Sequence, residues 1–157
     1  MAAVTIRPAT RDDIQAMLTI AAELHEWFAR GVPKLMQLDC ARRNGLVAVD
    51  ETGVVVGFLL WRCQEIDCWI EWLAVARAHH RQGIGRALID RLIGMARDCG
   101  AKFITTATVM PPREDHPYHG TVAFYEALGF ELQKIDRAGW PDGTDRAEYL
   151  LFIKATS

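Results

Sequence analysis

The stretch His79-His-Arg-Gln-Gly-Ile-Gly-Arg-Ala-Leu88 joins an apolar, strand-like segment to an amphipathic one. Gly83 and Gly85 allow a tight turn and place no side chain in the way of a close-lying anion. Backbone amides at the start of the following helix would offer about half a positive charge to such an anion. The stretch therefore predicts an anion-binding loop, although a plain turn that starts a helix would show the same pattern.

Two common phosphate-binding patterns do not fit this loop. The P-loop pattern G-x-x-x-x-G-K-[ST] is absent, and Leu88 stands where the dinucleotide-binding pattern G-x-G-x-x-G needs its third glycine. A dinucleotide-dependent oxidoreductase is therefore disfavoured, and the order of strands and helices expected below also disfavours it.

Hydrophobic periodicity on both sides of the loop predicts alternating strands and helices. Strands are expected over Val4–Arg7, Leu46–Val49, Val54–Trp61, Ile66–Val75, Phe103–Val109, Phe130–Ile135 and Ala147–Ile153. The second and third of these bracket Asp50-Glu-Thr-Gly53, which predicts a hairpin. Helices are expected from the N-cap Thr10 to Gly31, over residues 33–43, from Gly83 to Cys99 before Gly100, and over Val122–Leu128 before Gly129. This order predicts an α/β (α+β) fold with a mixed, mostly antiparallel central sheet of 6–7 strands and helices on both faces.

Length and charge limit the class of protein. A chain of 157 residues is expected to form a single domain over residues 1–157. A formal net charge of −2 gives no attraction of the whole surface to nucleic acid or to acidic membranes. No apolar run approaches the ~20 residues of a membrane span, and the N-terminus does not resemble a secretory signal. We therefore expect a cytoplasmic protein.

The four cysteines stand at positions 40, 63, 68 and 99. None of them forms a C-x-x-C pair, so a zinc site is disfavoured and no metal is expected. Buried, reduced thiols are the expectation for a cytosolic protein with this cysteine usage.

Three segments resemble those of one enzyme family. They are Glu71-Trp-Leu-Ala-Val75, His80-Arg-Gln-Gly-Ile-Gly85 with Arg86-Ala-Leu88, and Ala123-Phe-Tyr-Glu-Ala-Leu-Gly-Phe130. The chain resembles the GCN5-related N-acetyltransferases (GNAT family) over essentially its whole length. The resemblance implies the acyl-CoA N-acyltransferase fold and direct attack of a primary amine, from a small molecule or peptide, on acetyl-coenzyme A in a ternary complex. A catalytically silent acyl-CoA-binding or regulatory domain of the same fold is the alternative.

The resemblance also implies where the coenzyme binds. Its pyrophosphate would lie on the backbone amides of Arg81 through Arg86, and its pantetheine arm would pair with the backbone of Leu73 and Val75. The implied coenzyme-binding residues are Leu73, Val75, His80, Arg81, Gln82, Gly83, Ile84, Gly85 and Arg86. The family usually has Arg or Gln where this chain has His80, a departure expected to bear on the affinity rather than on the shape of the loop.

Tyr125 matches the tyrosine that donates a proton to the coenzyme sulfur in many members of the family. A phenol with an ordinary pKa near 10 keeps its proton at pH 7 and can give it to a forming thiolate. The alternative is a core tyrosine, because Val122, Tyr125 and Leu128 share a helical stripe.

Glu71 is the candidate general base, because an alkylamine must lose a proton before it attacks the thioester. Alternation along a strand predicts that Asp67, Trp69, Glu71, Leu73 and Val75 share one face. A carboxylate among Trp and Leu side chains is costly to bury unless it is partnered, and such surroundings favour a base. The alternative is a salt-bridged or solvent-exposed glutamate.

The acceptor amine is expected to meet Trp27, Asp67, His116 and His119. Asp67 is a weaker second candidate for the base. His116 and His119 lie in the polar loop before the Tyr125 helix, where solvated histidines are the alternative, and Tyr118 replaces the asparagine that is usual in the family. Trp27 is expected near the acceptor because that region covers the acceptor site in relatives; a core position is the alternative. Because many relatives pair, the resemblance also allows a homodimer.

The small net charge conceals two opposite local charges. Residues 65–71 carry −3 and residues 77–91 carry +3. A basic loop suits a phosphate-rich coenzyme, and a neighbouring acidic strand suits a cationic amine.

Overall fold

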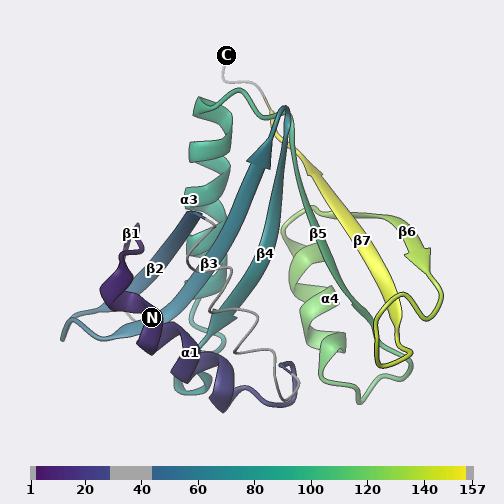
Figure 1. Ribbon diagram of the computed structural model, residues 1–157, viewed down its shortest axis with the longest axis horizontal. Coiled ribbons are helices and arrows are strands. Elements are labelled where there is room, and N and C mark those ends of the chain that lie inside the picture. The colour runs from purple at the N-terminus through teal and green to yellow at the C-terminus, as the bar shows by residue number, and fades with distance from the viewer. Residues whose placement is uncertain (1–2, 29–43, 155–157) are drawn as a thin grey trace. The chain divides into compact units, whose positions relative to one another are not determined.

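The computed structural model describes residues 3–28 and 44–154 (Figure 1). Seven strands form one sheet in the order β1-β2-β3-β4-β5-β7-β6. The strands are β1 (Val4–Pro8), β2 (Asn44–Asp50), β3 (Val55–Gln64), β4 (Asp67–Val75), β5 (Phe103–Met110), β6 (Glu131–Asp136) and β7 (Asp145–Phe152). The helices are α1 (Ile14–Glu23), α3 (Ile84–Asp98) and α4 (Tyr118–Ala127), with 3-10 turns η1 (Arg11–Asp13) and η2 (Arg77–His79).

The predicted fold class is confirmed. Strand β2 pairs antiparallel with β1 and β3, and β7 pairs antiparallel with β5 and β6. The predicted hairpin turn closes β2 onto β3, where the Asp50 carboxylate accepts hydrogen bonds from the amides of Thr52 at 2.9 Å and Val54 at 3.0 Å. Gly53 adopts a φ of 88°, which a side chain would disfavour.

The contacts of the chain define two compact units, which we describe separately. The first unit holds the described residues up to Arg62 together with Ile70–Met95. The second holds Cys63–Trp69 and the described residues from Ala96 onward. The single domain expected from the length of the chain stays a prediction.

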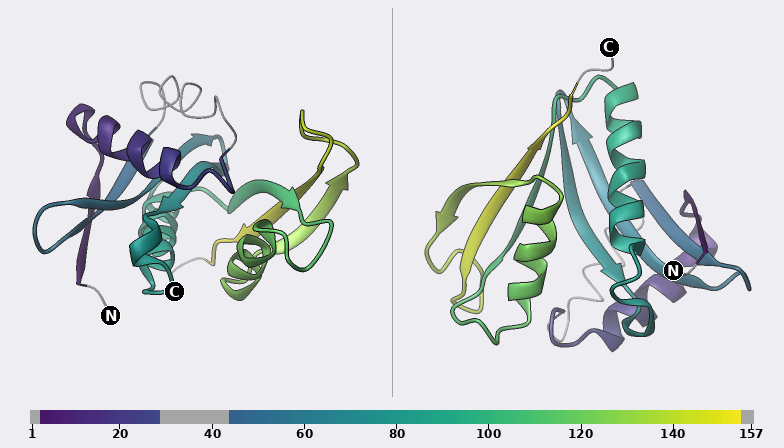
Figure 2. Two further views of the ribbon diagram at one scale, coloured as in Figure 1. Left: turned by 90° about the horizontal axis from the view of Figure 1, so that it is seen from below. Right: turned by 180° about the vertical axis from the view of Figure 1, so that it is seen from behind.

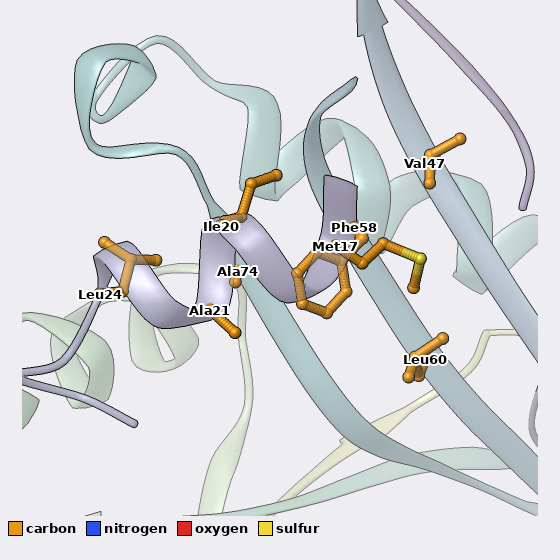
Figure 3. Packing of buried hydrophobic residues seen from close by; sticks show 8 residues of the cluster. All are labelled: Met17, Ile20, Ala21, Leu24, Val47, Phe58, Leu60 and Ala74. Atoms are coloured by element: carbon orange, nitrogen blue, oxygen red, sulfur yellow. The ribbon is translucent and has the colours of Figure 1, made fainter. Parts of the chain in front are cut away.

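In the first unit, α1 and α3 cover opposite faces of the strands (Figure 2). Alternation along β3 explains this, because Phe58 and Leu60 pack into the core beneath α1 (Figure 3). Gly57 faces the other way, and a Cβ there would lie 3.3 Å from Cγ2 of Ile84 in α3 and 3.2 Å from the carbonyl oxygen of Ala74. The predicted helices on both faces are therefore confirmed for this unit.

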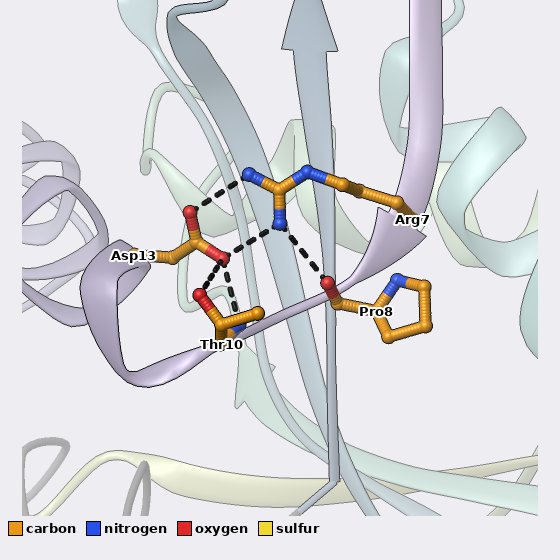
Figure 4. Close-up of polar contacts among 4 residues, drawn as sticks. All are labelled: Arg7, Pro8, Thr10 and Asp13. Atoms are coloured by element: carbon orange, nitrogen blue, oxygen red, sulfur yellow. Dashed lines mark hydrogen bonds and ion pairs between the residues drawn. The ribbon is translucent and has the colours of Figure 1, made fainter.

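The start of α1 is fixed by the buried carboxylate of Asp13 (Figure 4). Arg7 on β1 donates two hydrogen bonds to it, at 2.8 and 2.9 Å, and the Thr10 amide donates a third at 2.7 Å. The hydrogen bonds from Arg7 are the main cause that lowers the pKa of Asp13. Asp13 therefore ties the first strand to the first helix.

Replacing Asp13 by alanine is expected to lower the free energy of unfolding by about 2 kcal/mol, because charge-assisted hydrogen bonds are lost and Arg7 is left without its partner. Since the folded state lowers the pKa of Asp13, its stabilisation is present above the ordinary Asp pKa of 3.8 and is lost as pH falls further. Urea unfolding at pH 7 and pH 3 measures both effects, and Asp12→Ala at the exposed neighbouring position is the control. Equal losses at the two pH values would contradict this account.

Two helix boundaries differ from the predicted ones. Helix α1 ends at Glu23, well before the predicted end at Gly31, because residues 24–28 form a turn in which the Trp27 and Phe28 amides donate to the Leu24 carbonyl. Helix α4 begins at Tyr118 rather than at Val122, since Pro117 is compatible with a helix start. Gly31 and the helix predicted over residues 33–43 lie outside the described residues.

In the second unit, α4 lies along β5 (Figure 1). The helix closes at Gly129, whose φ is 95°, and the Phe130 amide donates back to the Tyr125 carbonyl at 3.1 Å. The hydroxyl of Tyr149 on β7 donates to Glu126 at 3.2 Å. These contacts confirm the predicted helix stop and hold the Tyr125 side of α4 against the strands.

The expectation of buried, reduced thiols is wrong for the cysteines that the structure describes. Cys63 and Cys68 form a disulfide, and Cys99 is an exposed free thiol. The pairing arises because the turn between the neighbouring strands β3 and β4 brings the two Cα atoms within 4.1 Å, a proximity that a search for C-x-x-C spacing does not detect. Cys40 lies outside the described residues.

Candidate functional site

The predicted anion loop is a sharp turn that leads directly into α3. Arg81 and Gly83 have φ values of 61° and 80°, in the left-handed region. For Arg81, this conformation costs roughly 1–2 kcal/mol, a kind of strain that often occurs at functional sites. The Ala87 amide donates to the Gly83 carbonyl at 3.0 Å. The first amides of α3, from Ile84 to Arg86, come before this bond and have no acceptor one helical turn back, as is usual at a helix start.

The loop is open where an anion would approach it. A Cβ added at Gly83 would meet no heavy atom within 4 Å. The side-chain oxygen of Gln82 is buried and has no hydrogen-bond partner in the structure as described. The loop therefore leaves space beside the backbone amides that begin α3.

His80 fixes the entrance to the loop. Its Nε2 lies 2.6 Å from the carbonyl oxygen of Val75, so Nε2 carries the proton and donates it. The backbone of Val75 was predicted to pair with the pantetheine arm. A carbonyl oxygen has two lone pairs, so the bond to His80 leaves one acceptor position.

Glu71 forms an ion pair with Arg62, with 2.5 Å between Oε1 and Nε. The salt-bridged geometry that the sequence left open is therefore present, and the base role stays a prediction.

Val75 faces the α3 side of the sheet. Its Cγ2 lies 3.4 Å from the Cβ position of Gly57, beside Ile84 of α3. Trp72 and Ala74, which alternate with Val75 along β4, pack with the core beneath α1. The shared face of Glu71 and Val75 stays a prediction.

Tyr125 is a buried residue of the second unit, with 5% of its surface exposed. Its ring packs edge-on against Phe124 and Phe130, each with centroids 5.2 Å away. Burial raises the pKa of Tyr125 to about 12, although the hydrogen bond with Thr106 acts in the opposite direction. The hydroxyl therefore keeps its proton at neutral pH. This is expected both for a proton donor and for a core tyrosine, so the role of Tyr125 stays a prediction.

The loop, the Glu71 ion pair and the buried Tyr125 do not by themselves identify a family, but a comparison with family models does. The model of the acetyltransferase (GNAT) family matches residues 12–130 of the 157. The chain belongs to the GNAT acetyltransferase family. It is accordingly an acyltransferase, and the family's model runs from η1 through the anion loop to Phe130.

Solved GNAT-fold structures superpose on nearly the whole of this GNAT chain. The ribosomal-protein-S18-alanine N-acetyltransferase of Escherichia coli is 22% identical with a TM-score of 0.81, covering 99% of this chain and 97% of its own. Ard1 of Thermoplasma volcanium is 20% identical with a TM-score of 0.78, covering 97% and 99%. YncA of Salmonella typhimurium, solved with its cofactor acetyl-CoA, is 24% identical with a TM-score of 0.73, covering 99% and 96%. These likenesses show a shared fold.

Asp67 and His116, two further predicted site residues of the second unit, have polar partners within that unit. Asp67 accepts a hydrogen bond from Thr105 at 2.9 Å. Because Thr105 and Thr106 are consecutive on β5, their side chains point to opposite faces, so Asp67 and Tyr125 approach β5 from opposite sides. His116 stacks on Tyr118, with centroids 6.0 Å apart, and accepts from its amide.

His119 is an exposed residue in the first turn of α4.

In the described part of the chain, no group of three or more His, Cys, Asp or Glu residues is arranged to hold a metal ion. No helix there has the length and apolar character that crossing a membrane requires.

Trp27 belongs to a cluster that the sequence did not reveal. Its ring lies 5.9 Å from the guanidinium carbon of Arg77 and 5.9 Å from the His80 ring, while Arg77 pairs with Glu26 at 2.6 Å. Trp27 was predicted to line the acceptor site, and the structure places it beside the entrance to the anion loop. Glu26 and Arg77 are 51 positions apart, so no local pattern could have paired them.

Proposed function

We propose that this protein transfers the acetyl group of acetyl-coenzyme A to a primary amine of a small molecule or peptide, by direct attack in a ternary complex. The observation that carries the proposal is the open loop at Gly83, whose amides lead into α3, in a chain of the GNAT family. A phosphate group suits such a helix start because backbone amides and the helix dipole both favour negative charge.

The coenzyme would bind along β4 and the loop. The amides of Arg81 through Arg86 would hold the pyrophosphate, and the charge of +3 over residues 77–91 would favour its approach. The backbone of Leu73 and Val75 would pair with the pantetheine arm. Gly83 suits this assignment because the space beside it is unfilled.

Chemistry at the thioester requires two proton transfers. The amine nitrogen attacks the thioester carbonyl carbon, and the carbon–sulfur bond breaks as the amide forms. Glu71, directly or through water, would take the proton that the amine loses, and Tyr125 would give its hydroxyl proton to the departing thiolate. Burial supports this role for Tyr125 because it keeps the phenol protonated at neutral pH.

The acidic stretch of β4 supports a cationic acceptor. Asp67 and Glu71 belong to the segment that carries −3, and a protonated amine is attracted to such a segment before it reacts. Trp27, His116 and His119 remain proposed acceptor contacts, and the Trp27 ring contacts His80 at the loop entrance.

The alternative proposal is a silent acyl-CoA-binding domain, and the observations that favour it are the departures from the family pattern at His80 and Tyr118. Both proposals predict that acetyl-coenzyme A raises the melting temperature. They differ in turnover, since only the enzyme releases free coenzyme A when an amine is added.

The deciding experiment measures thiol release from acetyl-coenzyme A across a panel of polyamines, amino acids, aminoglycosides and peptides. An alanine-initiated peptide belongs in the panel because one structural neighbour is named a ribosomal-protein-S18-alanine N-acetyltransferase. Cys99 is an exposed thiol and would react with the reagent, so Cys99→Ser removes that contribution, and protein without an amine gives the background. Thermal stabilisation without thiol release from any amine would support the silent domain instead.

A further inference from the structure

Arg77 connects the end of α1 to the segment that enters the anion loop. It is the first residue of η2, directly before the loop. Its guanidinium donates to the Glu26 carboxylate at 2.6 Å and to the Glu23 carbonyl at 3.1 Å. The Glu23 carbonyl belongs to the last turn of α1, where carbonyl oxygens lack helical partners and a cation is favoured.

Trp27 connects the turn after α1 to His80, at the other end of residues 77–80. Its ring contacts both Arg77 and His80, and His80 in turn donates to the carbonyl oxygen of Val75 at 2.6 Å. Phe28 continues the contact by packing on Trp72 of β4, with centroids 5.9 Å apart. Residues 77–80 are therefore held at both ends by the turn that follows α1.

We propose that Arg77 and Glu26 are positioning residues that hold the anion loop in the shape that binds the coenzyme. The inference rests on the proposed function, because it assumes that acetyl-coenzyme A binds at residues 80–86. Neither residue needs to touch the coenzyme. Arg77 holds the loop entrance through Glu26, the Glu23 carbonyl and the Trp27 ring, and His80 passes this constraint to the end of β4.

The opposite charges of Glu26 and Arg77 allow positioning of the loop to be distinguished from electrostatic attraction of the coenzyme phosphates. Glu26 is negative, and its pKa is lowered to about 2, mainly by the hydrogen bond from Arg77. If the pair acted only through its charges, removing the Glu26 carboxylate would leave Arg77 free to attract phosphate, and the coenzyme would bind as well or more tightly. If the pair positions the loop, the same change weakens binding. The two explanations predict opposite signs.

The experiment is calorimetric titration of the full chain with acetyl-coenzyme A, in the absence of acceptor. Glu26→Gln and Arg77→Gln are each expected to raise the Kd about threefold to fivefold, the range of an exposed ion pair. The double variant is expected to match either single variant, because both substitutions break the same contact. Lys134→Gln, which removes the surface pair with Asp136 on β6, is the control and should leave the Kd unchanged.

Amide hydrogen exchange supplies a readout that general destabilisation would not mimic. Acetyl-coenzyme A is expected to slow exchange at the amides of Trp27 and Phe28 in the wild-type chain and to lose that effect in Arg77→Gln. Tighter or unchanged binding by Glu26→Gln, multiplying effects in the double variant, or no coenzyme-dependent protection at these amides would each overturn the inference. A wild-type chain that does not bind acetyl-coenzyme A would instead overturn the proposed function on which the inference rests.

Discussion

Replacing Tyr125 by phenylalanine is expected to lower kcat by about 100-fold or more, the usual contribution of a general acid, with the Kd for acetyl-coenzyme A within about twofold of wild type. The substitution removes only the hydroxyl, because the ring contacts with Phe124 and Phe130 are kept. Steady-state kinetics with an identified amine and calorimetry with acetyl-coenzyme A measure the two quantities separately.

The raised pKa of Tyr125 gives this prediction a pH signature. A pKa of about 12 means that the hydroxyl is protonated at all pH values below the ordinary tyrosine pKa of 10. The rate should therefore show no alkaline decline caused by Tyr125 below about pH 10. Because the folded state raises this pKa, the phenol stabilises the fold below pH 10, and that contribution is lost as pH rises through 12.

Tyr149 is a matched control for Tyr125. It is also buried, its pKa is also raised to about 12, and its hydroxyl bonds to Glu126 in the same unit. Tyr149→Phe should cost stability in the same way and leave kcat unchanged. If Tyr125→Phe kept the wild-type kcat, Tyr125 would be a core tyrosine and the proton donor would have to be sought elsewhere.

Replacing Glu71 by glutamine is expected to lower kcat by about 100-fold, because a glutamine cannot accept the proton that the amine must lose. Stability should fall by less than about 1 kcal/mol, since the ion pair with Arg62 is partly exposed to solvent. The measurement is kcat for one amine, together with urea unfolding of the same preparations.

Arg62→Gln separates the base from the ion pair. It breaks the same contact but keeps the Glu71 carboxylate. If Glu71 is the base, Arg62→Gln should retain kcat within a few-fold while Glu71→Gln loses it. Equal kcat in the two variants, with equal losses of stability, would show that the pair only supports the hairpin of β3 and β4.

Elements with a local signal in the sequence were predicted closely. The turn at Asp50–Gly53, the start of α3 and the stops at Gly100 and Gly129 follow from residues whose backbone preference decides the conformation. The end of α1 was missed because Trp27 and Phe28 continue the helical pattern, whereas contacts with distant residues hold them in a turn. Hydrophobic spacing cannot distinguish these two outcomes.

The sequence by itself determined the order of the elements, the loop that leads into α3 and the family motifs that name the candidate residues. These features depend on glycine conformation, on periodicity and on neighbouring residues, all of which are local. Only the tertiary structure decided that Glu71 pairs with Arg62, that Val75 faces α3, that Cys63 joins Cys68 and that Arg77 holds the turn after α1. Each of these depends on which strands and turns lie side by side, and packing settles that arrangement.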